Sequence, residues 1–194
     1  MSEVRISCAS LASIKIDNKY LLLLNKRSYK QGRIVYTPIG GALEYHPNGK
    51  KFLDNLGARY ERETPDLRFK MDSENLELFR YWFEKSIDRE NDITRELIEE
   101  MVDEEKIFKS LDIKDFTTKY IRTETPIKDI DGVYNYFFFE IYNVTFTEDK
   151  VTEIKEYVKK NNDKIILVSD MEIKNGFTKD NIEIGDNTKS ILND

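Results

Sequence analysis

Apolar residues near the start of the chain fall into two short runs separated by a polar turn. Residues 5–17 are rich in small and β-branched side chains, and Tyr20–Leu24 is almost entirely aliphatic. Between them lies Asp17-Asn18-Lys19, a typical turn sequence. Two apolar runs around a polar turn predict a β-hairpin.

The rest of the chain alternates between strand and helix patterns. Runs rich in β-branched and aromatic residues predict strands, and apolar residues three or four apart predict helices. In chain order the pattern predicts a basic polar loop at 25–33, a strand at 34–37 ended by Pro38 and Gly40-Gly41, a helix at 52–60, an extended stretch at 67–70, a helix at 76–83, a helix at 92–106, strands at 117–122 and 133–144 with a turn at 128–132, a helix at 148–160, a strand at 165–168 and a short helix at 186–192. This order indicates an α+β (mixed α/β) fold.

The length favours a single domain over residues 1–194, with residues 46–91 as a helical insertion inside it. The insertion contains Leu76, Phe79, Trp82 and Phe83, which are too apolar to leave in water. Burying each such side chain stabilises the fold by roughly 1.5–3 kcal/mol. We therefore expect the insertion to cover the sheet or to contact a second subunit, so a homodimer is among the expected arrangements.

Composition and charge exclude several classes of protein. The chain has 31 Lys+Arg against 37 Asp+Glu and a net charge of -6. This acidic balance argues against general nucleic-acid binding, because neutralising phosphates needs a basic surface. No apolar run approaches the roughly 20 residues that span a bilayer, and no signal peptide is recognisable. We expect a soluble, cytoplasmic protein that does not associate with membranes.

Two residue types occur once each, and this limits the chemistry further. A single cysteine, Cys8, excludes an internal disulfide and Cys-rich zinc sites. A single histidine, His46, excludes a two-histidine metal motif and leaves no choice of partner for a catalytic Ser or Cys.

The helix predicted at 92–106 carries an acidic stripe. At about 100° per residue, Glu96, Glu99, Glu100 and Asp103 fall within a stripe about 100° wide, opposite Leu97 and Met101. Such stripes are most often solvated surface. Here like charges three and four residues apart repel by a few tenths of a kcal/mol per pair, and Arg95 is the only cation within residues 93–103. The alternative is a hard divalent cation, because Mg²⁺ and Mn²⁺ prefer carboxylate ligands.

A second feature lies upstream, at Gly40-Gly41-Ala42-Leu43-Glu44. Paired glycines permit unusual backbone angles and the close approach of a ligand. An ordinary turn at the end of a strand is the simpler interpretation of this pair taken alone.

Together the two features resemble the Nudix box. Gly40-Gly41-x-x-Glu44 resembles its opening, and Arg95-Glu96-Leu97-x-Glu99-Glu100 matches its helical core position by position. The resemblance implies a Nudix-like α/β/α sandwich with a mixed sheet, and places the insertion inside the box. The sequence departs from the box at His46 and Pro47, where a Gly-Glu pair is usual, and at Val102, which replaces a glycine. These departures predict slow catalysis.

Motifs in and next to the insertion resemble one particular group of Nudix domains. Asp66-Leu67-Arg68-Phe69, Trp82-Phe83 and Arg89-Glu90 are similar to the SMODS-associated Nudix group. That group is linked to bacterial nucleotide-signalling and anti-phage defence loci, and it has been proposed to sense nucleotide-derived ligands. The same apolar residues are also expected to form the core of the insertion.

The resemblance implies a function and assigns roles to residues. The substrate would be a small nucleotide, a nucleoside diphosphate linked to another group such as ADP-ribose or NAD, and water would attack its pyrophosphate. Mg²⁺ or Mn²⁺ would be held by Glu96, Glu99 and Glu100, with Arg95 orienting these carboxylates. The remaining expected site residues are Glu44, which pairs with the helix or completes the metal shell, and Gly40, Gly41, Arg27 and Tyr45, which contact the substrate.

Two alternatives to the enzyme remain open. The altered box favours a sensor that binds a signalling nucleotide without turning it over. A protein-interaction domain is the third reading, but it leaves the acidic stripe unexplained. The sequence assigns no general base; Glu124 and Glu140, on the later strands, are candidates for a further acid.

Overall fold

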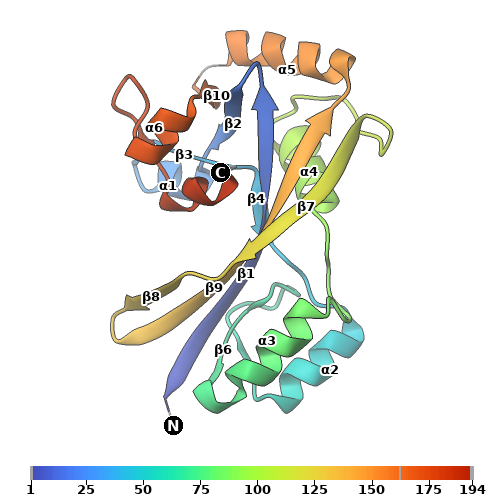
Figure 1. Cartoon of the computed structure of the whole chain (residues 1–194), viewed down its shortest axis with the longest axis vertical. Helices are drawn as coiled ribbons and strands as arrows, with labels where there is room; N and C mark the ends of the chain where they lie inside the picture. The colour runs from blue at the N-terminus through green and yellow to red at the C-terminus, as the bar shows by residue number, and fades with distance from the viewer. Residues whose placement is uncertain (1, 162, 193–194) are drawn as a thin grey trace. The chain divides into compact units, whose positions relative to one another are not determined.

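A computed structural model describes residues 2–161 and 163–192 of the chain. The chain divides into two compact units (Figure 1). The first unit comprises Met1–Ser10, Gly41–Asp92 and Arg122–Glu140, and the second comprises Leu11–Gly40, Ile93–Ile121 and Ile141–Asp194. Each unit has its own hydrophobic core, and each is described separately below.

The secondary structure is a mixed β-sheet with several helices, which confirms the predicted α+β class. The strands are β1 (Glu3–Ile16), β2 (Lys19–Leu24), β3 (Val35–Thr37), β4 (Gly40–Ala42), β5 (Arg59–Tyr60), β6 (Arg68–Asp72), β7 (Phe116–Glu124), β8 (Ile127–Ile130), β9 (Val133–Phe146), β10 (Ile165–Val168) and β11 (Glu183–Ile184). The helical segments are α1 (Lys26–Lys30), α2 (Pro47–Asn55), η1 (Ser73–Asn75), α3 (Leu76–Glu84), α4 (Thr94–Ile98), η2 (Glu99–Glu104), α5 (Glu148–Lys160), α6 (Asp170–Asn175) and η3 (Asp186–Ile191). Strand β11 pairs with β3 in parallel, whereas β2 pairs antiparallel with β1, β3 and β10.

The predicted hairpin is confirmed. Strands β1 and β2 pair with Lys15 opposite Tyr20. The turn residues Asp17 and Asn18 both have positive φ angles, 49° and 63°. Two consecutive residues of this type match the twist of two-residue hairpins, and Asp and Asn tolerate the conformation better than most side chains.

The first unit packs α2 and α3 with a small antiparallel sheet. Strand β6 pairs with the start of β1 on one edge and with β5 on the other. The rings of Phe52 and Trp82 stack with centroids 5.4 Å apart, and Trp82 is only 5% exposed. The apolar residues of the insertion are therefore buried as expected, but the insertion contains the strands β5 and β6 as well as helices.

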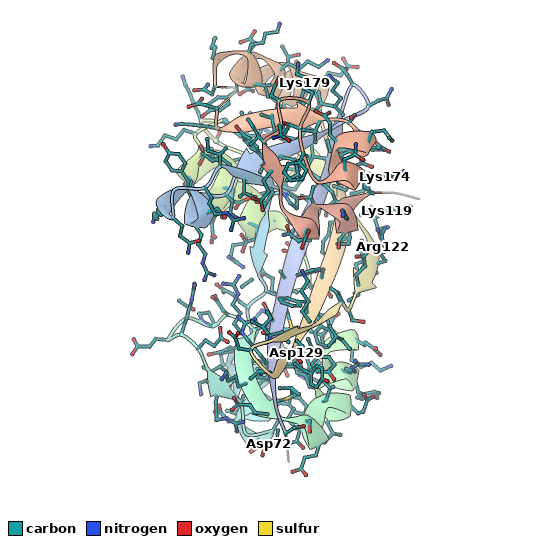
Figure 2. All side chains as sticks on the ribbon, turned by 90° about the vertical axis from the view of Figure 1, so that its left-hand side faces the viewer. Asp72, Lys119, Arg122, Asp129, Lys174 and Lys179 are labelled. Carbon is teal, nitrogen blue, oxygen red and sulfur yellow. The ribbon has the colours of Figure 1, made fainter. Side chains whose placement is uncertain are left out.

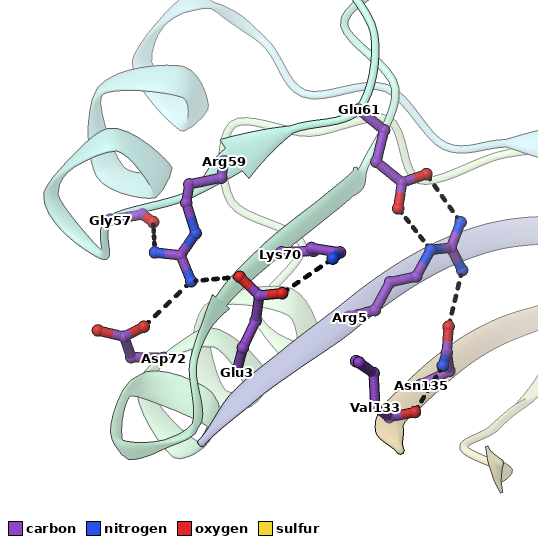
Figure 3. Close-up of polar contacts among 9 residues, drawn as sticks. All are labelled: Glu3, Arg5, Gly57, Arg59, Glu61, Lys70, Asp72, Val133 and Asn135. Carbon is purple, nitrogen blue, oxygen red and sulfur yellow. Dashed lines mark hydrogen bonds and ion pairs between the residues drawn. The ribbon is translucent and has the colours of Figure 1, made fainter. Parts of the chain in front are cut away.

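Charged side chains form a network on the outer surface of this sheet (Figure 3). Glu3 pairs with Lys70 and Arg59, and the guanidinium of Arg5 binds both carboxylate oxygens of Glu61. These groups are a quarter to a half exposed. Ion pairs at such exposure contribute roughly 0–1 kcal/mol each, so the unit depends mainly on its apolar core.

The second unit packs α4, η2 and α5 against its sheet. Leu97 and Met101 are fully buried in one core cluster with β-strand residues such as Leu21 and with Ile154 of α5. The apolar side of the predicted acidic helix is thus confirmed as core. None of the helices within residues 2–161 and 163–192 is long and apolar enough to cross a membrane.

Three local predictions are wrong, each for an identifiable reason. Residues 26–30 form the short helix α1, because the side chain of Asn25 caps it by accepting the Ser28 N–H at 2.9 Å. Tyr60 leaves the helical pattern and joins β5, since α2 ends at Asn55. Residues 127–130 form the strand β8 paired with β9, so that only Asp131-Gly132 remains as the turn.

Candidate functional site

The acidic helix changes its winding where the paired glutamates begin. Residues 94–98 are α-helical, but Glu99–Glu104 is a π-helix, in which the Glu105 N–H donates to the carbonyl of Glu100 at 3.0 Å. A single regular α-helix over 92–106, as predicted from the sequence, is therefore wrong. A π-helix is wider than an α-helix, so the α-helical angles assigned to the acidic side chains do not hold beyond Ile98. Short π segments frequently occur at functional sites.

Glu100 is held against the paired glycines. Its Oε2 accepts a hydrogen bond from the Gly40 N–H at 3.1 Å. Gly40 has a φ of 148°, which side-chain-bearing residues rarely adopt, so this position requires glycine. The structure thus joins one part of each sequence motif within the second unit.

The surroundings of Glu100 disfavour its charged form. Burial raises the pKa of its carboxyl to about 8, and the nearby negative charges of Glu96 and Glu104 also raise it, whereas the Gly40 hydrogen bond and the charge of Lys26 lower it. A carboxyl with this pKa is largely protonated at neutral pH. An additional positive charge at this place would return it to the ionised form.

Arg95 lies between the other two carboxylates. Its Nη2 is 2.9 Å from Glu96 Oε1, and its Nη1 is 3.1 Å from Glu99 Oε2. Glu96 is buried, whereas Glu99 is exposed. The orienting role of Arg95 stays a prediction, and the three glutamates differ in their access to solvent.

Lys26 neutralises part of the negative charge at the C-terminal end of the acidic helix. Its Nζ lies 2.8 Å from Glu104 Oε2 and 2.8 Å from Glu105 Oε1. Residues 93–103 contain no lysine, and Lys26 belongs to α1, some 80 residues upstream. A helical projection considers the residues of one helix only, so it cannot predict contacts with residues elsewhere in the sequence.

The remaining predicted site residues are divided between the units. Gly41, Glu44 and Tyr45 belong to the first unit, whereas Gly40 and Arg27 belong to the second with the acidic helix. Arg27 is exposed on α1. The ring of Tyr45 packs against Tyr60 with centroids 5.4 Å apart, which makes it part of the insertion's aromatic packing.

Glu44 is held by a partner that the sequence analysis did not single out for the site. The Glu44 N–H donates to the carboxylate of Glu90 at 3.2 Å, and the Glu90 N–H donates to the Glu44 carbonyl at 2.8 Å. The segments immediately before the insertion and at its end therefore lie side by side. The proximity of Arg89-Glu90 to the next motif was the only sequence signal for this pairing.

Glu140, a candidate for a further acid, is engaged in the core of the first unit. Its Oε1 accepts from Nη2 of Arg89 at 2.7 Å, and the side chains of this pair are 6% and 1% exposed. Arg89 also donates to the Phe83 carbonyl from Nε and Nη2, and its guanidinium lies 3.9 Å from the centre of the Phe83 ring. We interpret this buried pair as structural.

The carboxylates of this region are suitable ligands for a divalent cation, but their side chains are not arranged around a common point. Within residues 2–161 and 163–192, no group of three or more His, Cys, Asp and Glu side chains is positioned to hold a metal. Glu96 and Glu99 turn to Arg95, while Glu100 turns to Gly40. The donors are nevertheless hard oxygens, and a bound cation would favour the charged form of Glu100, whose pKa is raised mainly by burial.

The model of the SMODS-associated NUDIX domain family matches residues 3–192, nearly the whole chain. No curated protein and no solved structure matches the chain.

Proposed function

Because the chain belongs to the SMODS-associated NUDIX domain family, we propose that it is a nucleotide hydrolase that depends on Mg²⁺ or Mn²⁺. Its substrate is a nucleoside diphosphate linked to another group, of the ADP-ribose or NAD type. Nudix domains generally use divalent metal ions, and this general property supports the proposed cofactor.

The arrangement around Glu100 is the observation that carries the proposal. The partly buried carboxyl of Glu100, near Glu96 and anchored by the Gly40 N–H, has a raised pKa. Such a group is costly to ionise unless a cation is bound. Perturbed carboxyls of this kind concentrate at functional sites.

Several residues of the second unit would contribute to metal binding. Glu96, Glu99 and Glu100 would hold the cation, which when bound supplies charge neutralisation and a more acidic water. Arg95 would orient Glu96 and Glu99 through the charge-assisted hydrogen bonds that it already makes. The Gly40 N–H would fix the direction of the Glu100 carboxylate.

The proposed reaction is hydrolysis of the pyrophosphate. A water oxygen forms a bond to one phosphorus while the bond from that phosphorus to the bridging oxygen breaks. The bridging oxygen leaves with the other phosphorus, the two protons of the water pass to solvent, and the products are two phosphate monoesters. We expect the reaction to be slow, because His46, Pro47 and Val102 replace the residues usual in the box, and a misplacement of about 1 Å can cost on the order of 100-fold in rate.

A sensor that binds the same ligands without turnover is the second candidate. The contact of Arg95 with both Glu96 and Glu99 favours it, since two of the three expected metal ligands already have a cation. A sensor would tolerate an imperfect metal shell, because binding depends less on geometry than catalysis does.

Affinity and turnover measured together distinguish the two. ADP-ribose and NAD are incubated with the protein in Mg²⁺, in Mn²⁺ and in EDTA, and both binding and product are followed. The enzyme predicts metal-dependent product that is lost in Glu100→Gln and kept in Asp103→Asn, a matched exposed acid on the same helix. Binding without product supports the sensor, and binding of neither compound contradicts both candidates.

A further inference from the structure

Two arginines of the first unit share one carboxylate beside the start of β6. Arg62 Nη1 lies 3.8 Å from Asp66 Oδ2, and Arg68 Nη1 lies 3.9 Å from the same oxygen. All three residues belong to the insertion, and the proposed hydrolase uses none of them. In this arginine pair, Arg62 and Arg68, two guanidinium groups face a single carboxylate, which leaves one positive charge in excess.

The distances show that neither arginine is hydrogen-bonded to this carboxylate. An N–H···O hydrogen bond spans about 2.7–3.2 Å between the heavy atoms, so both contacts are ion pairs without a hydrogen bond. Within residues 2–161 and 163–192, the side chains of the arginine pair donate no hydrogen bond to any other protein group. The side chain of Arg68 is nevertheless only 28% exposed, so it has lost part of its hydration without gaining an acceptor.

The neighbouring arginines on the same sheet already have accepting partners (Figure 3). Arg5 donates to both carboxylate oxygens of Glu61. Arg59 donates to Glu3 at 3.2 Å and to Asp72 at 3.0 Å. The arginine pair therefore differs from its neighbours, because it lacks an anion that accepts its hydrogen bonds.

Ser7 adds a hydroxyl beside the arginine pair. It lies directly opposite Arg68 where β1 pairs antiparallel with β6, so the two side chains lie on the same face of the sheet. Ser7 is 8% exposed, and in the part of the chain that the structure describes its hydroxyl makes no hydrogen bond to protein. A serine hydroxyl can donate to the same anion as a guanidinium group.

The surroundings of Arg68 disfavour its charged form. Burial is the largest cause and lowers the pKa of its guanidinium, and the positive charges of Arg62 and Arg5 lower it as well. The negative charges of Asp66 and Glu61 act in the opposite direction. A bound anion would offset both the burial and the repulsion between the arginines.

From these contacts we propose that the arginine pair and Ser7 bind a phosphate group, either as inorganic phosphate or as part of a phosphate monoester. A tetrahedral phosphate offers several acceptor oxygens, so it can accept from two forked guanidinium groups and from a hydroxyl at once. Asp66 is not a ligand of this anion but repels it. The first unit alone supplies these residues, and the site requires no cation.

Calorimetric titration with sodium phosphate and with AMP, in EDTA and at constant ionic strength, tests the site. At least one of these probes should bind saturably with a stoichiometry of one, and adenosine, which lacks the phosphate, should not bind. Arg68→Gln should weaken binding at least about tenfold, because hydrogen bonds between charged groups are lost. The matched control is Arg59→Gln, which removes the same charge from the same sheet and should leave binding unchanged. Tighter binding of AMP than of inorganic phosphate would identify a monoester as the ligand, the reverse would identify free phosphate, and both support the site.

A further variant, Asp66→Asn, separates binding from folding. The carboxylate of Asp66 accepts no hydrogen bond within the described residues, so the amide should fold like the wild type. Removing its negative charge should tighten phosphate binding several-fold, because a like charge close to the anion is lost. Lys119→Gln removes an exposed cation of the second unit, labelled in Figure 2, and should have no effect. Thermal unfolding of every variant checks that folding is intact.

Four outcomes would overturn the proposal: no saturable binding of either probe, binding that survives Arg68→Gln, binding lost equally in Arg59→Gln, or weaker binding in Asp66→Asn than in the wild type. Binding of AMP that requires Mg²⁺ and disappears in Glu100→Gln would also overturn it, because it would place the ligand at the acidic helix. Since the titration is made in EDTA, failure of the proposed hydrolase leaves this test unaffected.

Discussion

The carboxylate of Glu100 accepts the backbone N–H of Gly40 at 3.1 Å, across 60 residues of sequence. Burial and neighbouring acids raise the pKa of this carboxyl to about 8. In the absence of a cation the group is largely protonated at neutral pH, and a protonated carboxyl closely resembles an amide. Glu100→Gln should therefore fold like the wild type while removing the charge that a divalent cation would need.

Breaking the buried ion pair of the first unit should cost more stability than breaking a more exposed pair of the same unit. Glu140→Ala leaves the guanidinium of Arg89 buried without its carboxylate. Removing one partner of a buried pair costs about 3–5 kcal/mol. Urea unfolding should show this loss, whereas Glu61→Ala, which removes a partner of the more exposed Arg5, should cost roughly 0–1 kcal/mol. Equal losses in the two variants would contradict the structural role of the pair.

Gly49 should resist replacement although it lies inside the helix α2. A Cβ added there would come within 2.3 Å of the Asp88 carbonyl oxygen and 3.1 Å of the Trp82 ring. Alanine usually stabilises a helix interior relative to glycine, but here we expect Gly49→Ala to destabilise by about 1–3 kcal/mol through overpacking. Thermal unfolding measures the effect. Lys51→Ala on the same helix is exposed and should change little, so a stabilised Gly49→Ala would refute the close packing.

Cys8 should be inert to thiol reagents in the native protein. Its side chain is fully buried, and burial raises the pKa of the thiol, so little thiolate is present at pH 8. Because it is the only cysteine, the absorbance change with a disulfide reagent reports this position alone. The reaction should be slow in buffer and fast in concentrated urea. A rapid native reaction would contradict the burial of this part of β1.

Glu172 should make the second unit less stable in acid. Burial alone would raise its pKa, but hydrogen bonds from the N–H groups of Ser169 and Lys179 lower it below the usual value. A pKa that is lower in the folded than in the unfolded state stabilises the fold above the unfolded value, and this contribution is lost as the pH falls through the folded value. Unfolding midpoints of Glu172→Gln should therefore vary less between pH 6 and pH 3 than those of the exposed control Glu156→Gln. Parallel pH profiles of the two variants would contradict the stabilising role of ionised Glu172.

Strand and helix positions with strong local patterns were predictable from the sequence. The helix at 148–160 and the strand at 165–168 coincide with α5 and β10, because the helix is amphipathic without interruption and the strand is a compact aliphatic run. The hairpin turn at Asp17-Asn18 was predictable for the same reason, since its residue types match its backbone angles. Short elements such as β5 and β11 carry too few residues for a pattern and depend on pairing with distant strands.

The candidate site was predictable in residue types but not in geometry. The sequence identified the acids and Gly40, yet the π-helix from Glu99 and the contact of Lys26 with Glu104 depend on tertiary structure. The pairing of Glu44 with Glu90 likewise joins residues 46 positions apart, one before the insertion and one near its end. Helical projection assumes a uniform helix and ignores other elements, so it could not give these relationships.

The most direct test of the proposed function is a calorimetric titration with Mn²⁺ of the wild type, Glu100→Gln and Asp103→Asn. We predict saturable binding of one ion by the wild type and by Asp103→Asn, and at least tenfold weaker binding by Glu100→Gln. The reason is that the partly buried carboxyl of Glu100 has a raised pKa, so that a bound cation would favour its charged form, whereas Asp103 is exposed on the same helix. Equal Mn²⁺ binding by all three proteins, or no binding by the wild type, would contradict the account and leave the acidic helix as solvated surface.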